Sequence, residues 1–143
     1  MSNLKSQNYG NHKKFAPLYH FFLMPLSLVI FIAAIVHLFR EEFGYSALLI
    51  TGISLCIIVL TLIVRIFATQ LQDRLIQHEE NFRHMQLTGK PLDPRLSVKQ
   101  IVALRFAGDT EFPALCKKAA ESGMQPAAIK QSVTQWRADY HRV

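Results

Sequence analysis

Two long stretches without charge constrain this chain more than any other feature. No Lys, Arg, Asp or Glu occurs from Phe15 to Phe39, and none occurs from Phe43 to Val64. At about 1.5 Å per residue, helices over 17–39 and 45–67 would each be about 34 Å long, and the hydrocarbon core of a bilayer is about 30 Å thick. A helix on the surface of a soluble protein has a polar face. The sequence therefore predicts an all-α integral membrane protein, with a two-helix transmembrane hairpin in contact with the lipid bilayer.

The distribution of charge predicts how the hairpin is oriented. Lys5, Lys13 and Lys14 precede the first span without any acid, whereas the turn between the spans contains one base and two acids, Arg40, Glu41 and Glu42. From Arg65 onward there are twelve basic and eight acidic side chains, a balance of +4. Since basic residues favour the cytoplasmic side, we expect a multi-pass protein with both termini cytoplasmic and an external turn. This mild positive charge requires no nucleic-acid partner, and we expect none.

The remaining segments follow from composition. We expect the domain order to be a polar N-terminal segment over 1–16, transmembrane helix 1 over 17–39, the external turn over 40–44, transmembrane helix 2 over 45–67, a cytoplasmic helix extension over 68–88, a linker over 89–96 and a C-terminal helical cap over 97–143. The second span and its extension should form one helix of about 40 residues, because Pro and Gly are absent from Arg65 to Gln86. Pro25 should kink the first span, or mark the switch from an interfacial turn to the true span.

The cap is predicted to contain three helices. Ser97 with Gln100 makes a capping box for the first of them, Thr110 can cap the second, and Pro126 begins the third. One face of the third helix carries large apolar residues at steps of four, three and four, namely Ile129, Val133, Trp136 and Tyr140. We therefore expect Trp136 to be buried at the centre of the cap.

A line of residues at heptad spacing, called here the heptad line, runs along the second helix. Its members are Ala47, Thr51, Ser54, Ile58, Thr61, Arg65, Ala68, Leu71, Leu75, His78, Phe82 and Met85. The line is mostly small or weakly polar inside the predicted membrane, where close approach of helices relies on such residues. Beyond the membrane it becomes mostly large and apolar, as in coiled coils in water. We take ten members as interface candidates: Ala47, Thr51, Ser54, Thr61, Arg65, Leu71, Leu75, His78, Phe82 and Met85.

Two interpretations of the heptad line remain open at this stage. It can pack on the first span and on the cap of the same subunit, or it can mediate self-association. The first span ends at the membrane surface and cannot cover Leu71 to Met85, which favours self-association for that part. If several copies assemble, their Arg65 side chains would form a ring at the mouth of a pore.

The sequence offers no group of residues for catalysis, a metal or a cofactor. His78, Glu79, Glu80 and His84 invite a metal interpretation, but on a helix only Glu80 and His84 share a face, and two ligands are too few. Solvated pairs four residues apart, including Glu79 with Arg83, explain these residues better. Cys56 and Cys116 lie in different environments, so no disulfide is expected. We therefore expect a protein that is not an enzyme.

Several motifs together resemble a family of small, uncharacterised bacterial two-span membrane proteins, a domain of unknown function. They are Gln7-Asn8-Tyr9-x-Asn11-His12, Tyr19-His20, Gln70-Leu71-Gln72-Asp73-Arg74, Leu104-Arg105-Phe106-Ala107, and Trp136-Arg137-Ala138-Asp139 with the closing Arg142-Val143. The resemblance implies a location in the cell inner membrane. It implies no activity, since none is assigned to the family, and no functional residues are transferred from it.

These observations favour a non-enzymatic role. We expect a self-associating scaffold, or a small accessory subunit of a larger membrane-protein complex. The alternative is a homo-oligomeric channel or transport component whose pore is lined by the face of the second helix that carries Thr51, Ser54 and Thr61.

Overall fold

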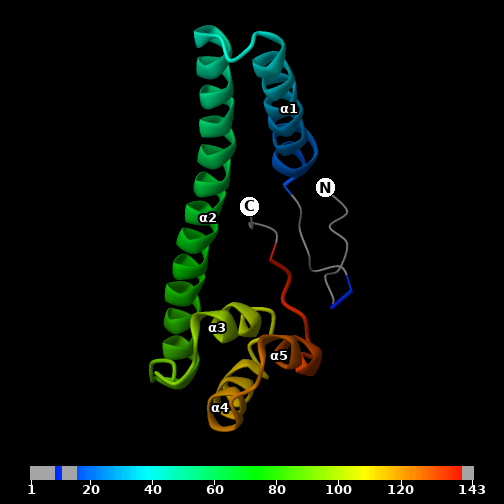
Figure 1. The fold of residues 1–143 in the computed structure, drawn as a ribbon. Helices are drawn as coiled ribbons and strands as arrows, with labels where there is room; N and C mark the ends of the chain where they lie inside the picture. Colours follow the sequence, from blue (N-terminus) through cyan, green and yellow to red (C-terminus); the bar gives the residue numbers. More distant parts are fainter. Residues whose placement is uncertain (1–8, 11–15, 140–143) are drawn as a thin grey trace, which may run out of the picture. The chain divides into compact units, whose positions relative to one another are not determined.

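The computed structural model describes residues 9–10 and 16–139 of the 143-residue chain. Its elements are η1 (Leu18–Leu23), α1 (Met24–Arg40), α2 (Tyr45–Thr88), α3 (Val98–Leu104), α4 (Phe112–Ser122) and α5 (Pro126–Ser132) (Figure 1). The described part contains no β-strand beyond an isolated bridge between Ala107 and Trp136. The expected all-α class is therefore confirmed. The chain divides into two compact units, a hairpin unit over 15–69 and a second unit formed mainly by 70–142.

The predicted continuous helix is present as α2, which has 44 residues and belongs to both units. It ends where Gly89 adopts a left-handed conformation with φ +73°, and the Gly89 N–H donates to the Met85 carbonyl at 2.8 Å. Glycine tolerates this conformation because it has no Cβ. At 1.5 Å per residue the helix is about 66 Å long.

In the hairpin unit, α1 and α2 lie side by side and antiparallel (Figure 1). The residues that lose most solvent contact in this unit are all small: Ser27, Ala34, Ala47 and Ser54. Thr51 Oγ1 donates to the carbonyls of Ala47 at 2.8 Å and of Ala34 at 3.2 Å, so it links the two helices. Small residues let two helical backbones approach closely, as in membrane helix pairs.

A turn of four residues, Glu41 to Gly44, reverses the chain between the two helices. Glu42 and Phe43 both have positive φ, at 45° and 62°. The Phe43 N–H donates to the Leu38 carbonyl at 3.0 Å, and the Gly44 N–H donates to the Glu41 carbonyl at 2.8 Å. These bonds use carbonyl groups that the end of α1 would otherwise leave without a partner.

Pro25 is accommodated by a wider helical turn. The π-helical segment η1 immediately precedes α1, in which Pro25 is the second residue. Proline provides no N–H and its ring crowds the carbonyl four residues earlier, and π turns are one way in which a helix absorbs such a disruption. The Arg65 guanidinium of α2 lies over the ring of Tyr19 in η1, 5.3 Å from the centre of the ring.

The second unit has its own hydrophobic core, built by α3, α4, α5 and the segments between them. The core consists of Leu92, Leu96, Ile101, Ala103, Leu104, Ala107, Phe112, Leu115, Cys116, Ala119, Ile129 and Val133. The predicted capping box is present: the Ser97 hydroxyl accepts from the Gln100 N–H, and the Ser97 N–H donates to the Gln100 side chain at 2.8 Å. Gln100 also donates to the Met124 carbonyl at 2.9 Å, which joins α3 to the start of α5.

The expected course of the last helix is wrong. Helix α5 ends at Ser132, and Val133 is extended with ψ 121°. Trp136 is half-buried rather than buried, in an extended segment where its ring lies 5.0 Å from that of Phe106. Tyr140, expected on the same helical face, lies outside the described residues.

Hydrogen bonds from distant residues explain why α5 stops. The N–H groups of Thr134 and Gln135 donate to the Glu111 carboxylate at 3.1 and 3.0 Å instead of to the preceding turn. The Gly108 N–H donates to the Gln135 carbonyl at 2.8 Å, which builds the isolated bridge. Glu111, and not the expected Thr110, occupies the N-cap position of α4.

We predict that Glu111→Gln destabilises the second unit by about 1–2 kcal/mol at neutral pH, because hydrogen bonds to a charged group are the stronger ones. Partial burial acts to raise the pKa of Glu111, but its hydrogen bonds with Thr134, Gln135 and Gly108 prevail and hold it below the ordinary 4.5. This contribution is therefore present above pH 4.5 and is lost as the pH falls through the lowered value. Urea unfolding followed by Trp136 fluorescence should show that the free energies of unfolding of the wild type and of the variant converge in acid. Glu121→Gln, at an exposed glutamate of α4, is the control.

Candidate functional site

Between residues 70 and 88, α2 presents two different faces. One face is buried against the rest of its unit through Ile76, Glu80 and Arg83, which are 6%, 5% and 8% exposed. The other face carries the last five members of the heptad line, Leu71, Leu75, His78, Phe82 and Met85, all of them exposed. We call these five residues the apolar stripe. At 100° per residue, the stripe lies on nearly the opposite side of the helix from the buried face.

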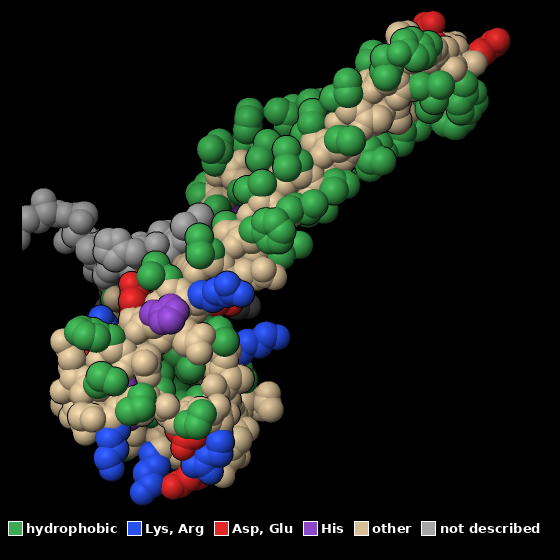
Figure 2. Space-filling view, turned by 90° about the vertical axis from the view of Figure 1, so that its left-hand side faces the viewer, with side chains coloured by type: hydrophobic (Ala, Val, Ile, Leu, Met, Phe, Trp, Pro, Cys, Tyr) green, Lys and Arg blue, Asp and Glu red, His purple; other side chains and the backbone are tan. Residues whose placement is uncertain are grey.

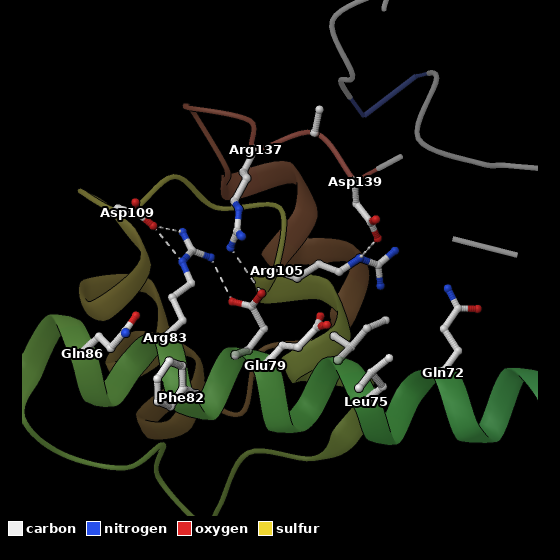
Figure 3. A pocket seen from close by; sticks show the side chains of 13 residues that line it. Gln72, Leu75, Glu79, Phe82, Arg83, Gln86, Arg105, Asp109, Arg137 and Asp139 are labelled. Atoms are coloured by element: carbon white, nitrogen blue, oxygen red, sulfur yellow. Dashed lines mark hydrogen bonds and ion pairs between the residues drawn. The ribbon is translucent and has the colours of Figure 1, made fainter. Parts of the chain in front are cut away.

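Arg83 lies at the centre of the buried face (Figure 3). Its Nη1 donates to Glu80 at 2.9 Å, its Nε to Asp109 at 2.7 Å, and its Nη2 to the Ala107 carbonyl at 2.7 Å. The guanidinium also lies 4.2 Å from the centre of the Phe112 ring, which suits a cation over an aromatic face. One side chain of α2 thus contacts the α3–α4 loop and the first residue of α4.

The negative charge of Glu80 needs Arg83 as a partner, because the Glu80 side chain is only 6% exposed. Burial raises the pKa of Glu80 above the ordinary 4.5, while its hydrogen bond and attraction to Arg83, and its attraction to Arg137, act in the opposite direction. Arg137 Nη1 lies 3.5 Å from Glu80 Oε1, so two guanidinium groups approach the same carboxylate. The negative charge of neighbouring Glu79 further disfavours ionisation of Glu80.

A separate ion pair joins Arg105 to Asp139 at 2.9 Å. The Arg105 side chain is 5% exposed, lies over the Phe106 ring at 4.3 Å and donates to the Val102 carbonyl at 3.1 Å. Figure 3 shows Arg105 and Asp139 directed at each other, away from Arg83.

These side chains surround an open pocket of about 670 Å³. Its lining residues are Gln72, Leu75, Ile76, Glu79, Glu80, Phe82, Arg83, Gln86, Arg105, Asp109, Arg137, Ala138 and Asp139. The charged groups in it mostly neutralise one another. Burial raises the pKa of the nearby Cys116 thiol to about 12, so it is not a reactive thiolate. The described residues include no group of three His, Cys, Asp or Glu side chains arranged to hold a metal ion.

The structure divides the predicted interface residues into two sets. Of the set in the hairpin unit, Ala47 and Ser54 are buried, while Thr51, Thr61 and Arg65 are half-buried. Thr51 and Ser54 donate to backbone carbonyls of the hairpin, and Thr61 Oγ1 donates to the Ile57 carbonyl at 2.7 Å. The other set is the apolar stripe, which no described residue covers.

The buried ion pairs do not follow from the sequence pattern. The spacing of Glu79 and Arg83 predicts a solvated pair, but Arg83 is buried and contacts Glu80 and Asp109 instead. The spacing of Ile76, Glu80 and Arg83, at steps of four and three, marks one helical face. Because two of these three residues are charged, the sequence indicates a solvent-exposed face. His84 is likewise structural, with Nδ1 2.7 Å from the Lys90 carbonyl oxygen.

We predict that Arg83→Met destabilises the second unit by about 3–5 kcal/mol, because it leaves the Glu80 charge buried without its main partner. Adding Glu80→Gln should restore part of this loss, since the uncompensated charge is then gone. Arg95→Met removes the exposed pair with Asp93 and serves as the control, with little change expected. Thermal unfolding followed by circular dichroism gives the melting temperatures of the wild type, the two single variants and the double variant. Equal midpoints for Arg83→Met and Arg95→Met would contradict the central role of Arg83.

Comparison with known proteins identifies a family for this chain, and that family has no known function. The profile of a family of unknown function (DUF6526) matches residues 1–143. No curated protein matches, and no solved structure does.

Proposed function

Because this chain belongs over its whole length to the DUF6526 family, whose function is unknown, we propose a function from its own residues. It is an integral membrane protein of two spans whose long second helix brings copies of the chain together. Its role is that of a non-enzymatic scaffold within a membrane assembly.

The surface of the hairpin unit supports the membrane part of this proposal. By length and composition, two helices qualify as membrane spans, Leu18–Arg40 with mean hydropathy 2.5 and Tyr45–Thr88 with 2.9 in its most apolar window. Only 11% and 17% of those windows are buried, whereas a core helix of a soluble protein is mostly buried. On the face that Figure 2 shows, many hydrophobic side chains lie along the hairpin unit. Exposed apolar surface of this extent supports a nonpolar surrounding for these helices.

The single observation that carries the scaffold proposal is the apolar stripe. Leu71, Leu75 and Phe82 are 70%, 58% and 63% exposed although they lie beyond the most apolar part of α2. The opposite face of the same helix segment is already occupied, through Ile76, Glu80 and Arg83. Burial of each large apolar side chain contributes roughly 1.5–3 kcal/mol before entropic losses. A partner that covers the stripe would thus gain several such contributions.

A second copy of the chain is the occupant that these residues favour. The stripe has the spacing of a coiled-coil interface, in which each helix packs on an equivalent helix. Arg74 flanks it on one side and Glu79 on the other, so the surface is complementary in charge to its own copy. The hydroxyl groups of Thr51 and Ser54 already bond within the hairpin. No observation favours a pore, and a channel is not part of the proposal.

The proposal predicts that both termini are cytoplasmic. Carbonate washing should leave the protein in the membrane fraction, and protease added outside intact cells should not remove a C-terminal tag. The reason is the charge difference between the basic ends of the hairpin and its acidic turn. Permeabilised cells provide the control, in which the tag should disappear. Removal of the tag from intact cells would show the opposite orientation.

The proposal also predicts that Leu75→Glu with Phe82→Glu reduces the protein mass of the detergent-solubilised particle to that of one chain. Charges placed at the centre of the stripe would lose their hydration when two copies meet. Light scattering coupled to size-exclusion chromatography measures the mass.

The matched control is Leu87→Glu with Val98→Glu. These residues are exposed, apolar and outside the stripe, so this variant should keep the wild-type mass. A monomeric wild type, or a stripe variant of unchanged mass, would contradict the proposal.

A further inference from the structure

The flanks of the apolar stripe determine how a second copy can lie on it. In heptad terms, Leu75 and Phe82 occupy a positions, and Leu71, His78 and Met85 occupy d positions. Arg74 then occupies a g position and Glu79 the following e position. In a parallel coiled coil a g residue of one helix lies next to the e residue five positions later on its partner, and Arg74 and Glu79 are five apart.

We infer that the second copy binds parallel and in register, with Arg74 of each chain paired to Glu79 of the other. This inference rests on the proposed self-association through the stripe. Two such pairs form in a symmetric dimer. An antiparallel arrangement would instead place g beside g and e beside e, so that Arg74 would meet Arg74 or Asn81, and Glu79 would meet Glu79 or a glutamine. Only the parallel arrangement pairs opposite charges.

Both side chains are available for this contact. Arg74 and Glu79 are exposed, and neither forms an ion pair with any residue that the structure describes. By contrast, Glu80 and Arg83 on the opposite face are occupied by each other and by Asp109 and Arg137. Asp73, which also forms no described ion pair, lies on the side of the helix away from the stripe, so Arg74 and Glu79 are the unpaired charges that flank it.

The pocket provides space beside Glu79. Its wall on α2 includes the e residues Gln72, Glu79 and Gln86 together with the a residues Leu75 and Phe82. The pocket therefore opens along the e side of the stripe (Figure 3). A partner helix on the stripe would carry its g residue Arg74 to the mouth of this pocket, where Glu79 is exposed and Glu80 and Asp139 lie further in. Glu80, Asp109 and Asp139 are already paired with arginines of the pocket, so Glu79 is the acidic group there that an incoming guanidinium can pair with.

The test is a charge exchange in the full-length protein in detergent. Arg74→Glu alone and Glu79→Arg alone each replace two attractive pairs by two repulsive ones, and each should weaken self-association roughly ten-fold. Arg74→Glu combined with Glu79→Arg in one chain restores both pairs and should return the affinity to about the wild-type value. When the two single variants are co-expressed with different tags, they should co-purify with each other in preference to themselves.

Lys118→Glu, a reversal at an exposed lysine of α4, is the matched control and should leave the affinity unchanged. Circular dichroism should show the wild-type helix content in every variant, because both altered side chains are exposed. If the single reversals have no effect, or the combined variant is not restored, while Leu75→Glu with Phe82→Glu still dissociates the particle, the parallel register is wrong and the scaffold proposal stands. A monomeric wild type would overturn both.

Discussion

The guanidinium of Arg83 is the contact on which the second unit depends. It bonds to Glu80 on its own helix, to Asp109 and to the carbonyl of Ala107, and it covers the ring of Phe112. Three of these four partners lie more than twenty residues away in the sequence. Because a buried charge without partners is strongly unfavourable, this arrangement fixes which face of α2 turns toward α3 and α4.

That choice of face has a consequence for function. With Ile76, Glu80 and Arg83 turned inward, the helical geometry directs Leu71, Leu75, Phe82 and Met85 outward. The more apolar of the two faces is thus left exposed and the more polar one is buried. A protein that only needed a stable fold would be expected to bury the apolar face. The reversal is understandable if the apolar stripe serves an interaction between molecules, and this is why we assign it to a second copy.

The hairpin unit is packed through different types of residue. Its contacts use small residues and hydroxyl groups, with Ala34, Ala47 and Thr51 at close approach, while the large apolar side chains point outward. In water the exposed apolar side chains would be unfavourable. In lipid they contact apolar tails without such a penalty, and the close approach of the two helix backbones provides the attraction between the helices. Each half of α2 therefore carries residues suited to a different medium.

The sequence by itself determined the elements that depend on local chemistry. The apolar stretches, the absence of Pro and Gly from Arg65 to Gln86, and the Ser97–Gln100 capping box predict helices that the structure contains, since spacing and caps act over a few residues. Tertiary structure decided what depends on distant partners. Helix α5 stops at Ser132 because Glu111 accepts the next N–H groups, although the apolar spacing would carry the helix on to Trp136. Likewise Arg83 and Glu80 look like solvated surface residues in the sequence, and only the presence of Asp109, Ala107 and Phe112 around them makes their burial favourable.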